Sequence, residues 1–93
     1  MASFTTRVEL HSATETHYAT LHAELERRGF SRLIRADDGT WYHLPTAEYN
    51  YDGAATIDTV FGLAEASANS TGRNSWILVT ESVRRRFKLA PVK

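Results

Sequence analysis

The chain has 93 residues, of which 42% are hydrophobic and 24% are charged, and its 11 Lys and Arg residues balance its 11 Asp and Glu residues. This length and composition predict a single folded domain over residues 1–93 and exclude a disordered chain. The lack of cysteine excludes disulfide and thiol chemistry and fits a reducing compartment such as the cytoplasm.

The sequence carries no membrane or export signal. No segment approaches the roughly 20 apolar residues that span a bilayer. The N-terminal stretch MASFTTRVEL lacks the apolar run of a secretory signal peptide. We therefore expect a soluble, unprocessed, cytoplasmic protein without a membrane partner.

Residues 3–11, SFTTRVELH, have the pattern of a half-buried strand. Apolar or small residues alternate with polar ones here, and a period of two sends the two sets to opposite faces. A helix is predicted to follow, because residues 12–15 have the Ser-x-x-Glu spacing of a capping box. Its apolar residues recur at intervals of three and four, and Gly29 suits the left-handed position that ends a helix.

Two short strands are predicted next, at residues 31–36 and 40–44. The turn that joins them, Asp-Asp-Gly, readily supplies the positive φ of a tight hairpin. Pro45 lacks a backbone donor and closes the second strand. Residues 46–53, TAEYNYDG, are interpreted as either a bent extension of that strand or an ordered loop.

A second helix is predicted to begin after Thr56, a good N-cap residue, and to end at residues 69–72. Residues 75–80, SWILVT, are apolar and β-branched, which is typical of a buried strand. Residues 84–89 are interpreted as a short fifth strand that returns from it.

The elements therefore follow the order strand, helix, strand, strand, helix, strand. This is the order of an α+β, ferredoxin-like βαββαβ two-layer sandwich. We expect a four-stranded antiparallel sheet, extended by the short fifth strand, with both helices on one face. The other face is then free for solvent, a ligand or a second subunit.

Charge is distributed unevenly along the chain. The residues after Val83 include five cations and no acid: Arg84, Arg85, Arg86, Lys88 and Lys93. A net charge of zero argues against the broad positive surface of a general nucleic-acid binder, but a local basic strip could still hold a few phosphates. Alternatively, these charges only keep the last strand soluble.

The outward side of the first strand places Arg7, Glu9 and His11 in one row, about 7 Å apart. An imidazole transfers protons readily near neutral pH, and an arginine beside it could hold a phosphate. The row therefore fits proton-transfer chemistry, although exposed charges on a sheet also form ordinary cross-strand pairs.

Rings and imidazoles are concentrated in residues 41–51: Trp41, Tyr42, His43, Tyr49 and Tyr51. Aromatic side chains stack the bases of single-stranded RNA, so this segment could bind RNA or line a subunit contact. Packing in the core is the alternative. No spacing of His, Asp and Glu indicates a metal site.

Four segments together resemble the GhoS family: FTTRVELH, LERRGFSR, RADDGTWYHLPTAEY and SWILVTES. That family consists of small ferredoxin-like proteins related in fold to the CRISPR-associated Cas2 nucleases. The resemblance implies an endoribonuclease that acts as the antitoxin of a type V toxin–antitoxin pair by cleaving the messenger RNA of a small membrane toxin. It also implies a homodimer.

Active Cas2-like nucleases use an acidic residue at the end of the first strand together with a divalent metal. This sequence has Glu9 and then His11 where an Asp is expected. We therefore expect His11 or His43, with Glu9, to transfer protons to and from a 2′-hydroxyl or water, in a scheme that needs no metal, with a divalent metal as the alternative.

We expect single-stranded or messenger RNA to lie along the open sheet face of the dimer. The candidates for binding it are Arg7, Arg32, Arg35, Trp41 and Tyr42. The alternative is a non-catalytic dimeric module, such as an accessory or inhibitor protein of a phage or mobile element. It would use the open face and residues 41–51 to bind a protein or RNA partner.

Overall fold

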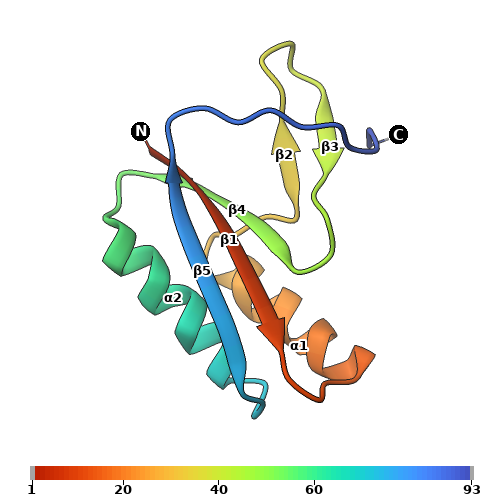
Figure 1. Cartoon of the computed structure of the whole chain (residues 1–93), viewed down its shortest axis with the longest axis vertical. Coiled ribbons are helices and arrows are strands. Elements are labelled where there is room, and N and C mark those ends of the chain that lie inside the picture. Colours follow the sequence, from red (N-terminus) through yellow and green to blue (C-terminus); the bar gives the residue numbers. More distant parts are fainter. Residues whose placement is uncertain (1, 93) are drawn as a thin grey trace.

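A computed structural model describes residues 2–92 as an α+β fold of two helices and five strands (Figure 1). In chain order the elements are β1 (Ala2–Leu10), α1 (Glu15–Arg27), β2 (Leu33–Arg35), β3 (Trp41–His43), β4 (Glu48–Gly53), α2 (Ile57–Asn69) and β5 (Ser75–Ser82). Neither helix is long and apolar enough to cross a bilayer.

The strands form two sheets, so the prediction of one four-stranded sheet is wrong. β1 is the middle strand of a three-stranded antiparallel sheet, with β4 on one side and β5 on the other. β2 and β3 form a separate antiparallel hairpin. Residues 46–53, interpreted as a strand extension or a loop, therefore contain the strand that pairs with β1.

Side-chain burial explains why β4 and not the hairpin joins the main sheet. Tyr49 of β4 is 1% exposed, whereas Ile34 is the only buried residue of β2 and β3. Placing β4 beside β1 thus buries a large ring in the core. The hairpin touches the sheet through one bridge, in which the backbones of Ser31 and Asn50 exchange hydrogen bonds of 2.8 and 2.7 Å.

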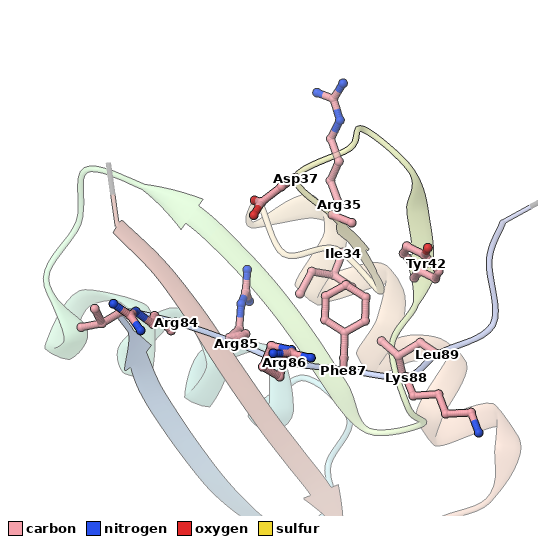
Figure 2. A pocket seen from close by; sticks show the side chains of 12 residues that line it. Ile34, Arg35, Asp37, Tyr42, Arg84, Arg85, Arg86, Phe87, Lys88 and Leu89 are labelled. Carbon is pink, nitrogen blue, oxygen red and sulfur yellow. The ribbon is translucent and has the colours of Figure 1, made fainter.

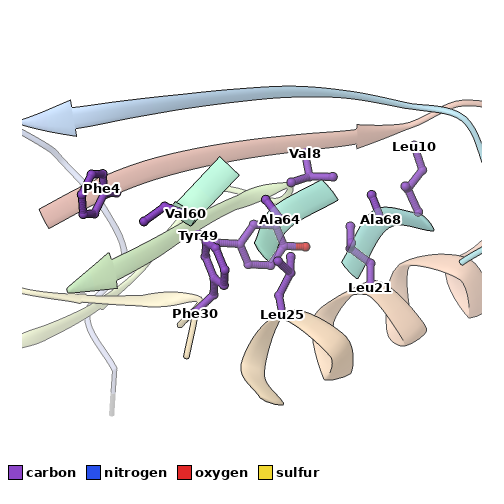
Figure 3. Packing of buried hydrophobic residues seen from close by; sticks show 10 residues of the cluster. All are labelled: Phe4, Val8, Leu10, Leu21, Leu25, Phe30, Tyr49, Val60, Ala64 and Ala68. Carbon is purple, nitrogen blue, oxygen red and sulfur yellow. The ribbon is translucent and has the colours of Figure 1, made fainter. Parts of the chain in front are cut away.

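Both helices cover the same face of the sheet, as the sequence predicted. Figure 3 shows the core, which lies between the sheet and the two helices and contains residues of β1, β4 and both helices. The core residues are Phe4, Val8, Leu10, Leu21, Leu25, Phe30, Tyr49, Val60, Ala64 and Ala68. The second set of β1 side chains, Ser3, Thr5, Arg7 and Glu9, therefore lies on the opposite side of the sheet, which we call the open face.

The helix ends follow local sequence signals in part. The Oγ1 of Thr56 accepts a hydrogen bond of 3.1 Å from the backbone N–H of Thr59 and caps α2 as predicted. Gly29 has a φ of +98° after the end of α1, again as predicted. The predicted capping box at residues 12–15 is wrong, because Thr14 is the N-cap and its N–H donates to Nδ1 of His17 at 3.0 Å.

Residues 83–92, which we call the tail, leave β5 and cross the open face towards the hairpin (Figure 1). The backbone N–H of His43 donates to the carbonyl of Ala90, and that of Val92 donates to the carbonyl of Trp41, both at 2.9 Å. The predicted fifth strand at residues 84–89 is wrong. This segment is mostly cationic and has few apolar side chains to bury against a sheet, so it passes over the sheet instead of extending it.

Candidate nucleic-acid interface

The tail and the β2–β3 hairpin enclose a groove of about 900 Å³ (Figure 2). We call it the tail groove. Its walls are residues 34–37, Tyr42 and residues 83–89. Its lining residues include five cations, Arg35, Arg84, Arg85, Arg86 and Lys88, and one carboxylate, Asp37. The groove is therefore strongly basic although the whole chain is neutral.

Two side chains of the tail hold it in place. Arg85 donates through Nη1 to Oδ1 of Asn50 at 2.5 Å and to Oγ1 of Thr5 at 3.4 Å. Phe87 packs edge-on against the ring of Tyr42, with the ring centres 5.2 Å apart. Arg85 is thus engaged with the sheet and is not available to a ligand.

The remaining cations of the tail are free. Among residues 2–92, Arg84, Arg86 and Lys88 form no ion pair, and all three are exposed. They lie within a few residues of each other on one strip of chain that Arg85 fastens to the sheet. Fixed cations of this kind suit an extended polyanion, because its charges repeat along a chain in the same way.

Two of the five predicted RNA-binding residues, Arg35 and Tyr42, are among the lining residues of this groove, whereas Trp41 lines a different pocket. Tyr42 lines it, and Arg35 stands at its rim with its guanidinium pointing away from the tail (Figure 2). Trp41 is 46% exposed and lies under the guanidinium of Arg35, 5.8 Å from it. This is a cation–π contact on the outer side of the hairpin.

The other two predicted arginines lie elsewhere. Arg7 is on the open face, where it forms ion pairs of 2.6 Å with Glu9 and 3.3 Å with Glu48. Arg32 lines a different pocket, together with His43 and residues of the α1 end. The structure therefore does not bring all three predicted arginines onto one surface.

The predicted proton-transfer residues separate in a similar way. His11 follows the end of β1, and its imidazole packs edge-on against the indole of Trp76, with ring centres 4.7 Å apart. Glu9 lies opposite Trp76 in the sheet register, so His11 and Glu9 share one neighbour. His43 lines the pocket of Arg32 and is apart from them.

Nε2 of His11 is buried and has no hydrogen-bond partner in the part of the chain that the structure describes. The backbone around this histidine is nonetheless fixed, because its N–H donates to the carbonyl of Asn74 at 2.8 Å and its carbonyl accepts from Nε of Arg73 at 3.1 Å. A buried ring nitrogen without a partner is uncommon, and a catalytic role is one of the explanations for it. His11 therefore remains a candidate for proton transfer.

Trp76 is the residue that the sequence analysis missed. Residues 75–80 were predicted to be a buried strand, yet Trp76 is 70% exposed and Leu78 is 64% exposed. The prediction of burial is wrong because β5 is an edge strand and the helices cover only one of its faces. The sequence carried no signal for this arrangement, because residues 76–79 are all apolar and show no alternation of apolar with polar side chains.

The residues present do not fit the divalent metal of active Cas2-like nucleases. Within residues 2–92, no three His, Asp or Glu side chains are grouped so that they could hold a metal ion. Glu9, the acid nearest to the expected position, is already bound by Arg7. We therefore derive no chemical step through a metal.

The chain was also compared with known proteins. No protein-family model matches it, and no curated protein has a matching sequence.

Proposed function

We propose that this protein binds single-stranded RNA in the tail groove and cleaves it, as an endoribonuclease antitoxin that acts on a toxin messenger RNA in the cytoplasm. One observation carries the binding part of the proposal: Arg84, Arg86 and Lys88 are free cations on a strip of chain that is fastened to the sheet. The GhoS resemblance supports the cleavage part.

The groove suits a single strand for two reasons. Its cations can neutralise successive phosphates, which contribute much of the affinity of nucleic acid for proteins. The ring of Phe87, which is 38% exposed, lies on the tail among the lining residues of the groove and offers a surface for an unpaired base. A duplex presents its phosphates but keeps its bases stacked inside, so it gains only the first of these contacts.

Cleavage without a metal can proceed by transfer within the RNA. A base removes the proton of a 2′-hydroxyl, the 2′-oxygen bonds to the adjacent phosphorus, and the bond from phosphorus to the 5′-oxygen breaks. An acid then protonates that 5′-oxygen. We assign these two proton transfers to His11 and Glu9, which both neighbour Trp76. The products are a 2′,3′-cyclic phosphate and a 5′-hydroxyl.

Binding is tested with a fluorescently labelled RNA of about ten nucleotides, a length within the usual span of single-strand sites. Arg86→Ala should weaken binding, because it removes a free cation of the groove. Arg27→Ala is the matched control. It removes the same charge from the opposite side of the fold, in α1, and should leave the affinity unchanged. Equal losses of RNA affinity in both variants would contradict binding in the tail groove and show that affinity follows only the net charge of the protein.

Cleavage is tested on the same RNA and on a copy with 2′-deoxyribose throughout, each with magnesium and with a chelator. We expect the RNA to be cut in both solutions and the deoxy copy to stay intact. His11→Ala should abolish cutting while binding persists. An uncut RNA under every condition would exclude the enzyme and leave only the binding function.

A second candidate function is the non-catalytic dimeric module. The observation that favours it is the pair Trp76 and Leu78, two large apolar side chains exposed on an edge strand. Exposed edges with few charges often pair with another chain. Sedimentation at increasing protein concentration tests this candidate, which requires a dimer that Leu78→Glu converts to a monomer.

A further inference from the structure

Trp76 is the most exposed aromatic side chain among residues 2–92, at 70%. It lies on β5, on the open face, directly opposite Glu9 of β1. The ring of His11 lies perpendicular to its indole, at 89°, while much of the surface of the indole remains open to solvent. An aromatic side chain exposed to this degree is unfavourable in water, and such exposure is typical of a surface that another molecule covers.

Two depressions meet at this side chain. One, of about 200 Å³, is lined by Arg7, Glu9 and residues 76–78. The other, of about 510 Å³, lies between α2 and β5 and is lined by His11, Phe61, Glu65, Asn69, Arg73 and Asn74 as well as residues 75–77. Both hydrogen-bond donors and acceptors therefore surround the indole, within reach of a planar polar molecule.

We infer that Trp76 is a stacking platform for one unpaired base of the bound RNA, and that this base is the one next to the bond that is cut. This inference rests on the proposed function. A base has a flat apolar face and a polar edge, which match the open indole and the charged groups around it. A base on Trp76 would bring its own ribose towards Glu9 and His11, the two groups assigned to proton transfer.

The distance from the tail is short enough for one RNA strand to reach both places. Arg85 fastens the tail over Thr5, and Trp76 lies opposite Glu9, four residues further along β1. Four residues of a strand span about 13 Å. The tail groove and the indole thus lie on one side of the sheet, within the length of a few nucleotides.

A second copy of this chain is the competing occupant of the indole. An apolar contact between two copies at this position would also cover the ion pair of Arg7 and Glu9, whose side chains are 48% and 39% exposed. Removing an exposed ion pair from water without new partners is unfavourable. The polar edge of a base supplies such partners, so the charges around the indole favour RNA.

The experiment uses the Trp41→Phe variant of the full chain, in which Trp76 is the only tryptophan. Titration with a ten-nucleotide RNA of mixed sequence should quench its fluorescence as the base stacks. In this background Trp76→Leu should weaken RNA binding by about 5- to 150-fold, as the loss of one stacked base does. Trp76→Phe, which keeps an aromatic face, should restore most of the affinity. Ile57→Ala, an exposed apolar position outside both depressions, is the control and should not change it.

Each outcome separates this inference from the function on which it rests. If the unmodified chain binds no RNA, the proposed function fails. If it binds RNA and Arg86→Ala weakens binding, but Trp76→Leu has no effect and the fluorescence is not quenched, only the stacking platform is excluded. Sedimentation of the same variants tests whether a second copy of the chain covers the indole. A dimer that Trp76→Leu dissociates would overturn the inference.

Discussion

The guanidinium of Arg85 donates to the side-chain oxygen of Asn50, a residue 35 positions earlier in the chain, and so ties the tail to β4. Asn50 is 6% exposed and its amide also donates to Oδ2 of Asp52 at 2.8 Å. One arginine of the basic run is thus a structural residue, and it positions its neighbours over the open face.

Replacing Arg85 should therefore destabilise the protein and release the tail. Arg85→Ala leaves the buried oxygen of Asn50 without its donor, which costs about 1–3 kcal/mol of unfolding free energy. Denaturant unfolding measures this loss, and faster hydrogen exchange at the amides of His43 and Val92 reports the release. Arg84→Ala is the control. It should change stability by no more than about 0.5 kcal/mol, because Arg84 is exposed. Equal effects of the two substitutions would contradict the structural role of Arg85.

The salt dependence of RNA binding should report the number of free cations that contact phosphates. For a single strand, the logarithm of the affinity falls with the logarithm of salt by about 0.7 for each phosphate contact, so three contacts predict a slope of about −2. Arg86→Ala should reduce the steepness by about 0.7. Affinities measured across a salt series give both slopes. A slope unchanged by the substitution would place the RNA outside the tail groove.

The stability of the fold should fall in mildly acidic solution because of His22. The hydroxyl of Tyr49 and Nδ1 of His22 form a hydrogen bond of 2.7 Å, which joins α1 to β4. Burial, and then the positive charge of Arg32, lower the pKa of His22, while burial raises the pKa of Tyr49. Because the folded state disfavours the charged imidazole, this contribution is complete above the unfolded pKa of about 6.5 and is lost as the pH falls through the folded pKa.

The measurement is the unfolding free energy from above neutral pH down to about pH 5, a range that brackets the ordinary histidine pKa. His22→Asn should remove part of the decline, since asparagine does not titrate. Arg32→Ala should raise the pKa of His22 and also make the decline smaller. An unchanged decline in His22→Asn would assign it to other groups.

The carboxylate of Glu24 should titrate unusually low. It accepts hydrogen bonds from Arg27 at 3.0 Å and from Arg28 at 2.9 Å, and these bonds lower its pKa to about 2. Since the folded pKa lies below the unfolded one, the interaction stabilises the fold above about pH 4.3 and is lost as the pH falls towards the folded pKa. A titration followed by NMR measures it. Arg27→Ala and Arg28→Ala should each raise the pKa of Glu24, and together restore its ordinary value.

The cap of α2 should contribute measurably to stability. Thr56→Ala removes the acceptor for the N–H of Thr59 and should lower the unfolding free energy by about 1 kcal/mol. For a domain of this size that corresponds to a fall in Tm of about 4–8 °C. Calorimetry measures it, and Thr56→Ser, which keeps the hydroxyl, should retain most of the stability. Equal losses in the two variants would exclude the hydroxyl as the cause.

Features that depend on near neighbours in the chain were predictable from the sequence. The alternation of residues 3–11 predicted β1, and Thr56 and Gly29 predicted a helix start and a helix end. Gly39, in the turn of the hairpin, has a φ of +89°, which its Asp-Gly sequence favours. Each of these signals acts within a few residues, so its outcome needs no knowledge of the rest of the fold.

The pairing of strands was not predictable in the same way. Either residues 31–36 or residues 46–53 could pair with β1 as judged from the sequence, because both contain apolar or aromatic side chains. The choice depends on which segment can bury a large ring against both helices, and Tyr49 does so whereas β2 buries only Ile34. That comparison involves contacts between residues far apart in the chain.

The features of the candidate site also fall into two groups, those that were predictable from the sequence and those that depend on the fold. The basic character of the C-terminal segment could be predicted before the fold was known, because composition is independent of folding: residues 84–88 contain four cations and no acid. Three other features became visible in the folded chain alone: this segment crosses the open face, Arg85 holds it there, and Trp76 lies beside Glu9 and His11. Exposure and long-range hydrogen bonding depend on which faces the helices cover, and the packing of the whole chain determines those faces.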